Sequence, residues 1–356
     1  MPGLTEVVRQ HGQHYIERHG GRLLPSHVRA LHAIARCRTA ALGGHLAHCP
    51  RCDTEHLLYH SCRHRACPQC GHDATERWLS RQRELMLPVP YFHVVFTLPA
   101  ELRRVVRAHQ KALLPVLFRA AFEALAALCT DPKHVGGQVG ALAVLHTWTR
   151  TLEWHPHVHL LVPGGALAKD GRTWLPGKAG RKPFLVPVKA LAKRFRGRFL
   201  HLARRALSSV DLPHVPWSKH WVVFTKPAVQ GADAVLTYLA RYVHRTAIAD
   251  KAVTASDDGR VTFTYRDSRD HKHKRMTLPA HEFLRRFLQH VPAKGLHRVR
   301  AYGLLHPAHR DTLRRLQLLL ASETKPASQR KSARRARRCP RCHHEALVLL
   351  RRLAPD

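Results

Sequence analysis

The sequence predicts a mixed α+β protein, in which a small zinc-binding helical domain precedes a larger domain built on a β-sheet. Two pairs of closely spaced cysteines lie between Cys49 and Cys70. After them, runs rich in β-branched and aromatic residues, such as Tyr91–Leu98, alternate with helical patterns. The chain of 356 residues also exceeds the roughly 250–300 residues at which a single hydrophobic core stops growing. More than one domain is therefore expected.

The composition indicates a polyanionic partner. Sixty Lys and Arg residues stand against 24 Asp and Glu residues, which gives a formal net charge of +36. Nucleic acid is the first candidate, and an anionic membrane surface is the alternative. No apolar run reaches the roughly 18–20 residues of a membrane span, and residues 1–20 lack the apolar core of a signal peptide. We expect a cytoplasmic protein with no membrane partner.

The spacing of the cysteines predicts a structural zinc site in the N-terminal domain. Two C-x2-C pairs are separated by fourteen residues, which is close to the spacing of zinc ribbons. Each pair directs two thiolates at one point, and two pairs complete a tetrahedron. Four protein ligands close the site, so its role is structural. The predicted ligands are Cys49, Cys52, Cys67 and Cys70.

Other possible ligands remain outside this set. Three residues are left over: Cys62, His56 and His64. Either one of them replaces a predicted ligand, or they bind a second ion, or they are buried or solvated bystanders. Cys339 and Cys342, which two histidines follow, form half of another zinc site. Those histidines or another part of the chain would complete it.

Secondary-structure signals and composition divide the chain into three segments. A Pro-x-Pro break at Pro88 and Pro90 marks the first boundary, and a shift to Lys, Arg, Ser and Ala from Ser322 marks the second. We expect a helical and zinc-binding domain over 1–88, a sheet-containing domain over 89–321, and a basic tail over 322–356. The predicted helices cover 5–19, 26–38, 74–86, 101–129 with a break at Pro115, 188–207, 233–245, 280–290 and 307–320. The predicted strands cover 91–98, 139–148, 221–225, 261–265, 274–278 and 297–302.

The stretch Trp154–Gly165, WHPHVHLLVPGG, carries a candidate catalytic metal site. Side chains of a strand alternate between its faces, so His157 and His159 share one face and Val158 turns to the other. Two imidazoles on one strand supply two-thirds of a divalent-metal site. Because Pro156 cannot donate to a ladder, regular pairing is expected from His157 onward. The alternative is a solvated strand, since a chain with 31 histidines contains His-x-His pairs by chance.

A pair of tyrosines and a basic helix are further candidates. Tyr238 and Tyr242 lie four residues apart on the predicted helix 233–245, which Asp233 can cap, and they therefore share a face. Alternatively they are core residues with their hydroxyl groups at the rim. The basic helix 188–207 either contacts a phosphate backbone or presents a solvated face.

Taken in this order, these features resemble the two-tyrosine HUH transposases of bacterial insertion sequences, the rolling-circle enzymes of the insertion-sequence ninety-one (IS91) type. HUH denotes His-hydrophobic-His, here His157-Val158-His159. The resemblance includes an N-terminal transposase zinc-binding domain and covers most of the chain. The strings that carry it are SCRHRACPQC, FHVVFTLP, LHTWTRTLEWHPHVHLLVPGG, YLARYVHR and EFLRRFLQHV.

The resemblance implies an antiparallel sheet of ferredoxin or RNA-recognition-motif type, with helices on one face and the histidines on a central strand. It implies that the protein nicks and rejoins single-stranded DNA through a covalent 5′-phosphotyrosine on Tyr238 or Tyr242. His157 and His159 would hold Mg²⁺ or Mn²⁺, and His155 and Glu153 are weak candidates for the third ligand. The implied partners are single-stranded or hairpin DNA at the element's ends and a target DNA, in a bacterial cytoplasm at the nucleoid.

Two alternatives stand beside the transposase. A rolling-circle replication initiator would use the same chemistry at a plasmid or phage origin. A non-catalytic zinc-dependent DNA-binding protein would use the histidines and tyrosines structurally. The N-terminal zinc knuckle and the missing helicase motifs favour the transposase, whereas the recognised DNA sequence, the oligomeric state and the order of tyrosine use do not follow from the sequence.

Overall fold

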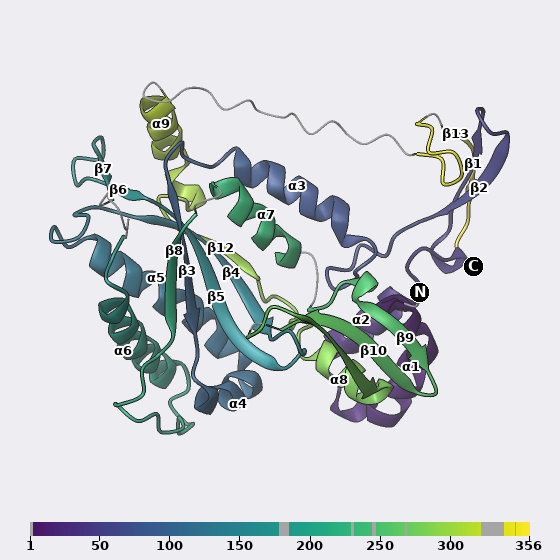
Figure 1. Ribbon diagram of the computed structural model, residues 1–356, viewed down its shortest axis with the longest axis horizontal. Coiled ribbons are helices and arrows are strands. Elements are labelled where there is room, and N and C mark those ends of the chain that lie inside the picture. Colours follow the sequence, from purple (N-terminus) through teal and green to yellow (C-terminus); the bar gives the residue numbers. More distant parts are fainter. Residues whose placement is uncertain are drawn as a thin grey trace. The chain divides into compact units, whose positions relative to one another are not determined.

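The computed structural model describes residues 3–177, 185–228, 231–243, 247–267, 269–321, 338–345 and 347–356. The chain forms two compact units, and both are discontinuous in sequence (Figure 1). One unit comprises 1–76, 244–291 and 328–356, and the other comprises 77–243 and 292–327. This arrangement differs from the three consecutive segments expected from composition, because the first and last parts of the chain fold together. Residues 322–337, which include most of the expected basic arm, lie outside the described residues.

The larger unit contains a five-stranded sheet in the order β12-β4-β5-β3-β8, with every neighbouring pair antiparallel. Its strands are β3 (Tyr91–Thr97), β4 (Gly140–Trp148), β5 (Trp154–Pro163), β8 (Val223–Pro227) and β12 (Val299–Gly303). Strand β5, which carries the His-hydrophobic-His motif, is the central strand. The expected α+β class, the antiparallel sheet and the central position of the histidines are confirmed.

Three helices cover one face of this sheet: α4 (Ala100–Ala108), α5 (Gln110–Cys129) and α6 (Val188–Ala206) (Figure 1). The helix break falls at His109 and not at the expected Pro115, which lies inside α5. Helix α5 is long and apolar enough to cross a membrane, but most of its residues are buried in this core. Packing against the sheet therefore accounts for its hydrophobicity.

Helix α7 (Ala232–Val243) covers part of the opposite face of the sheet. Its apolar stripe of Leu236, Leu239 and Val243 packs on side chains of β4 and β5. The resemblance implied helices on one face alone, and the apolar stripe of α7 explains the difference. Asp233 lies in the first turn of α7, where it accepts two hydrogen bonds, of 2.5 and 3.0 Å, from Arg83 of α3 (Gly71–Arg83).

The smaller unit combines helices with two three-stranded sheets. Its helices are α1 (Leu4–His19), α2 (Pro25–Ala35) and α8 (Ala280–Leu288). One sheet has the order β11-β10-β9, formed by His273–Pro279, Arg260–Arg266 and Val253–Asp257, and it contains the predicted hairpin. The other has the order β13-β1-β2, formed by Val348–Leu353, Gly44–Cys49 and Thr54–Tyr59. The larger unit also contains β6 (Gly165–Leu167), β7 (Trp174–Pro176) and α9 (Arg310–Ala321).

Candidate active site and metal centres

The two histidines of the HUH motif lie side by side on β5. Their ring centroids are 5.0 Å apart, and Val158 between them is fully buried in the core beneath α4–α6. Pairing of β5 with β3 begins at His157, opposite Thr97, as Pro156 led us to expect. The predicted shared face of His157 and His159 is confirmed.

A third histidine joins this pair from the neighbouring strand. His146 of β4 lies opposite His157 in the antiparallel register. One ring nitrogen from each of His146, His157 and His159 lies within 4.8 Å of the other two, and His146 and His159 are only 3% and 6% exposed. His155 and Glu153, the weak candidates for a third ligand, are not members of this group. The register of the β4–β5 hairpin, rather than proximity in sequence, identifies the third member.

Hydrogen bonds orient the two motif histidines. Nδ1 of His157 lies 2.7 Å from the backbone oxygen of His155, to which it can only donate. Nδ1 of His159 lies 2.7 Å from Nε2 of His93 on β3, and the two rings are stacked. Within the part of the chain that the structure describes, the buried Nε2 of His159 has no hydrogen-bond partner. A bond at Nδ1 directs Nε2 toward a metal, so this donor set fits a divalent ion.

The buried environment keeps these imidazoles neutral. Burial lowers the pKa of His157 to about 4 and, together with Lys226, lowers the pKa of His93 to about 4. Burial and the neighbouring histidines lower the pKa of His146 and His159 well below the usual value. At neutral pH all four rings are therefore uncharged, and an uncharged imidazole keeps one ring nitrogen without a proton, which is the atom that binds a metal.

Helix α7 brings a tyrosine to the histidines. The ring centroid of Tyr238 lies 6.3 Å from that of His159 and 6.4 Å from that of His93. Tyr242 lies one turn further along α7, but its side chain is outside the described residues. The structure thus brings together one predicted tyrosine and both predicted histidines.

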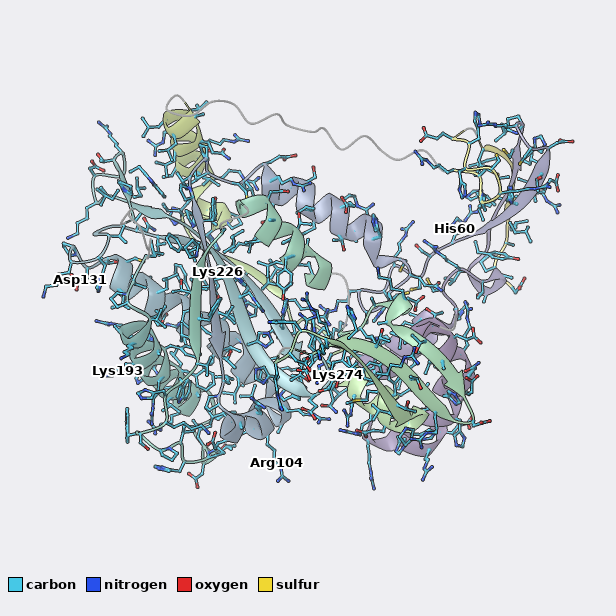
Figure 2. All side chains as sticks on the ribbon, viewed as in Figure 1. His60, Arg104, Asp131, Lys193, Lys226 and Lys274 are labelled. Atoms are coloured by element: carbon cyan, nitrogen blue, oxygen red, sulfur yellow. The ribbon has the colours of Figure 1, made fainter. Side chains whose placement is uncertain are left out.

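The same face of the sheet continues to an exposed edge. Val95 of β3 is paired with His159 on one side and with Phe224 of β8 on the other, so all three side chains share a face. Phe224 is 51% exposed and Val222 is 63% exposed. Lys226, labelled in Figure 2, lies two residues beyond Phe224 on β8. An apolar edge with a cation therefore adjoins the histidine group.

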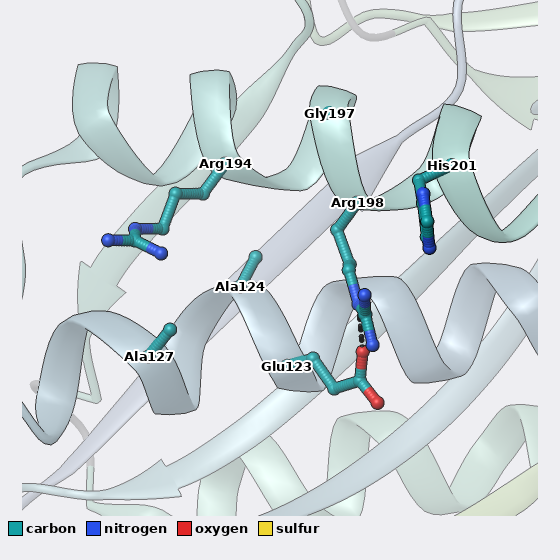
Figure 3. A pocket seen from close by; sticks show the side chains of 7 residues that line it. All are labelled: Glu123, Ala124, Ala127, Arg194, Gly197, Arg198 and His201. Atoms are coloured by element: carbon teal, nitrogen blue, oxygen red, sulfur yellow. Dashed lines mark hydrogen bonds and ion pairs between the residues drawn. The ribbon is translucent and has the colours of Figure 1, made fainter.

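The opposite face of the sheet is covered by α4, α5 and α6, and a basic groove lies between α5 and α6. Arg194, Arg198 and His201 of α6 line a cavity of about 560 Å³ together with small side chains of α5 (Figure 3). Arg198 donates to Glu123, which also accepts from Arg119 at 2.6 Å. Burial disfavours the charge of Glu123, but Arg198 and Arg119 outweigh it and lower its pKa. The basic helix thus has an exposed cationic face, as either of the two interpretations of its sequence requires.

The four predicted zinc ligands do not form one site. Cys67 and Cys70 lie with Cys37 and Cys62, whereas Cys49 and Cys52 lie with Cys339 and Cys342. In each group the four sulfur atoms are within 4.8 Å of one another. The prediction of a single site from Cys49, Cys52, Cys67 and Cys70 is therefore wrong in its grouping, because the two C-x2-C pairs belong to different parts of the smaller unit. Cys37 and Cys62, neither of which was among the four predicted ligands, take the places of Cys49 and Cys52 beside Cys67 and Cys70.

Comparisons with known proteins agree with these two kinds of site. The family model described as "Transposase zinc-binding domain" matches residues 7–98, and the one described as "Putative transposase" matches residues 140–312. The "Putative transposase y4qJ" of Sinorhizobium fredii (strain NBRC 101917 / NGR234) is 35% identical over 98% of this chain and 95% of its own length. The "Transposase for insertion sequence element IS801" of Pseudomonas savastanoi pv. phaseolicola is 30% identical over 80% of this chain and 72% of its own. No solved structure matches the chain.

The first family model covers the Cys37 group and one pair of the second group, and the other covers β4, β5 and α7. The N-terminal domain is thus a zinc-binding domain whose zinc is structural. As a transposase, the protein acts on DNA, in general terms by cleavage and strand transfer. The chain belongs to the IS91-type transposases with an N-terminal zinc-binding domain.

Proposed function

We propose that this transposase nicks and rejoins single-stranded DNA at the ends of its element through a covalent 5′-phosphotyrosine, as in rolling-circle transposition. The observation that carries the proposal is the position of Tyr238, whose ring lies 6.3 Å from His159 of a three-histidine group. A phenol is a poor nucleophile at neutral pH, since its ordinary pKa is near 10. A neighbouring ion and fixed geometry are what such a nucleophile needs.

The residues His146, His157 and His159 would hold the catalytic divalent ion. Held there, such an ion would supply positive charge for the scissile phosphate oxygens, which would orient the phosphate and stabilise the charge of the transition state. Three imidazoles form a softer ligand set than Mg²⁺ prefers, so Mn²⁺ is the better candidate of the two. His93 contacts Nδ1 of His159 through its Nε2 and would act as a positioning residue.

The proposed reaction exchanges one phosphate ester for another. The Tyr238 oxygen forms a bond to phosphorus, the bond from phosphorus to the 3′ oxygen breaks, and the phenolic proton is lost while the 3′ oxygen gains one. The phosphodiester bond energy is conserved, so no high-energy cofactor is required. A 3′-hydroxyl can later attack the phosphotyrosine and restore the tyrosine. Tyr242, on the same helix, would serve as the nucleophile for the second strand.

The edge of the catalytic face supports single-stranded DNA as the substrate. Phe224, on the same face as His159 but one strand further along the sheet, and Val222 expose apolar side chains, and Lys226 adds positive charge. Unpaired bases stack on exposed aromatic rings, whereas the bases of a duplex are already stacked on one another. The exposed basic face of α6, which includes Lys193 (Figure 2), is suited to further phosphate contacts. A DNA partner of this kind agrees with action in the cytoplasm at the nucleoid.

The decisive experiment is the capture of the covalent intermediate. The protein is incubated with Mn²⁺ and a labelled single-stranded oligonucleotide from the element's ends, and the products are separated on a denaturing gel. We expect a protein–DNA band that is lost in Tyr238→Phe combined with Tyr242→Phe, and lost in His157→Ala. A band of unchanged intensity in these variants would contradict the assignment of the site. Failure of the wild-type protein to form the band with any such oligonucleotide would favour a non-catalytic DNA-binding role.

A further inference from the structure

The last part of the chain lies beside the first zinc-binding segment. The sulfur atoms of Cys49 and Cys342 are 3.6 Å apart, and so are those of Cys52 and Cys339. A tetrahedral zinc with Zn–S bonds of about 2.3 Å places its sulfur atoms about 3.8 Å apart. Pairs that are 287 and 293 residues apart in sequence therefore already have the separations that zinc requires.

The two halves of this group have the same sequence. Cys49–Cys52 and Cys339–Cys342 both read Cys-Pro-Arg-Cys. In the C-terminal copy, the backbone nitrogens of Arg341 and Cys342 lie 3.4 and 3.5 Å from the sulfur of Cys339. Nε2 of His56 lies 3.2 Å from the same sulfur. Donors arranged around a sulfur stabilise a thiolate, which is the form that binds zinc.

Strand β13 is held on β1 by backbone pairing more than by burial. It pairs with β1 from Gly44↔Leu353 to His48↔Val348, but five of its six residues are exposed. Hydrophobic burial therefore contributes little to keeping it on β1. Gly43 accommodates the approach: its φ is +62°, and a Cβ there would lie 2.6 Å from the backbone oxygen of Leu353. The N-terminal segment is shaped to receive the C-terminal one.

We propose that Cys49, Cys52, Cys339 and Cys342 bind a second zinc ion, which completes the N-terminal zinc domain with the C-terminal end of the chain. The first ion is held by the group around Cys67, entirely within the N-terminal segment. The second cross-links both ends of the chain into the three-stranded sheet β13-β1-β2. This inference rests on the geometry of the cysteines and does not depend on the proposed nuclease mechanism.

Zinc content tests the proposal directly in the full-length protein. Elemental analysis should give two zinc ions per wild-type chain and one in Cys339→Ser combined with Cys342→Ser. Cys342→His, which retains a zinc ligand, should keep two. Cys129→Ala is the matched control, because Cys129 is buried in the core of the larger unit and belongs to neither group. One zinc ion in the wild type, or two in the double serine variant, would overturn the proposal.

Hydrogen exchange then tests the cross-link. In Cys49→Ser combined with Cys52→Ser, the amides of residues 348–353 should lose their protection, although the substitutions are about 300 positions away in sequence. The amides of α1 and α2 should keep theirs, which shows that the variant is still folded around Cys37. Unchanged protection of β13 in a variant that has lost one zinc would show that the metal does not hold the strand, and would overturn this part of the inference.

Discussion

The histidine centre and the cysteine centres are assembled in opposite ways. The histidines come from two adjacent strands of one sheet, and His146 and His157 are only eleven residues apart in sequence. The cysteines of one group come from segments nearly 300 residues apart. The histidine group offers three ligands with a tyrosine beside it, whereas each cysteine group offers four. Three ligands leave coordination positions for a substrate, and four thiolates leave none. A metal in the histidine group would therefore serve the proposed chemistry, whereas a zinc in a cysteine group would serve the architecture of the smaller unit.

The largest difference should appear when a ligand is removed and stability is measured. Cys67→Ser combined with Cys70→Ser removes half of the Cys37 group, and structural zinc sites contribute about 10 kcal/mol or more to apparent folding free energy. We expect the variant to lose one zinc ion, and we expect the smaller unit to lose its cooperative thermal transition. Circular dichroism as a function of temperature measures that transition. The control Cys129→Ala should change the transition only as an ordinary core substitution does. A normal transition in the cysteine variant would contradict a structural role for this group.

The histidine centre should respond in activity and not in stability. His157→Gln removes a proposed ligand, and we expect the yield of covalent adduct to fall by about 10³-fold or more, as when a reactive group is removed. The thermal transition and the zinc content should stay close to those of the wild type. His155→Gln is the matched control on the same strand, because its side chain is outside the three-histidine group, and it should retain the adduct. A collapse of stability in His157→Gln comparable to that of the cysteine variant would make the centre structural.

The same contrast explains what the sequence could predict. The HUH pair followed from alternation along one strand, and the tyrosine helix from periodicity, because both signals are local. The sequence did not identify His146 as part of the group. Its identification requires the register of the β4–β5 hairpin, which places His146 opposite His157. Its signal was present: a histidine near the end of a predicted strand that leads into the motif strand.

The grouping of the cysteines was not available from local spacing. Two C-x2-C pairs fourteen residues apart look like one site, and only the pairing of β1 with β13 reveals that Cys49 and Cys52 belong with the end of the chain. Cys37 was equally hidden, since it stands alone after α2 with no partner nearby in sequence. A single sequence indicates the residue types and the presence of zinc sites. It does not indicate which distant strands pair. The packing of α7 on the face of the five-stranded sheet opposite to α4–α6 was also not expected, because it too depends on contacts between segments distant in sequence.

A smaller effect is expected at His93, which contacts His159 but is not one of the three ligands. His93→Ala removes the partner of Nδ1 of His159, and loss of such a partner typically weakens metal binding by about 10–100-fold. The Mn²⁺ concentration for half-maximal adduct should rise by a similar factor, while the yield at saturating Mn²⁺ stays near that of the wild type. His93→Gln, which keeps a polar group at this position, should restore part of the affinity. An unchanged Mn²⁺ dependence in His93→Ala would show that the contact does not orient a ligand.

The smallest expected effect concerns the exposed edge beside the histidines. Phe224→Ala removes the aromatic face on which an unpaired base would stack, a contact worth about 1–3 kcal/mol, or roughly 5- to 150-fold in affinity for a single-stranded oligonucleotide. Affinity for a duplex of the same sequence should change much less, because its bases are not free to stack on a side chain. Leu318→Ala is the control, since Leu318 is also exposed but lies on α9, outside the catalytic sheet. Fluorescence anisotropy would measure both affinities. An equal loss for duplex and single strand would assign Phe224 to the packing of β8 and remove the reason for extending the catalytic surface to this edge.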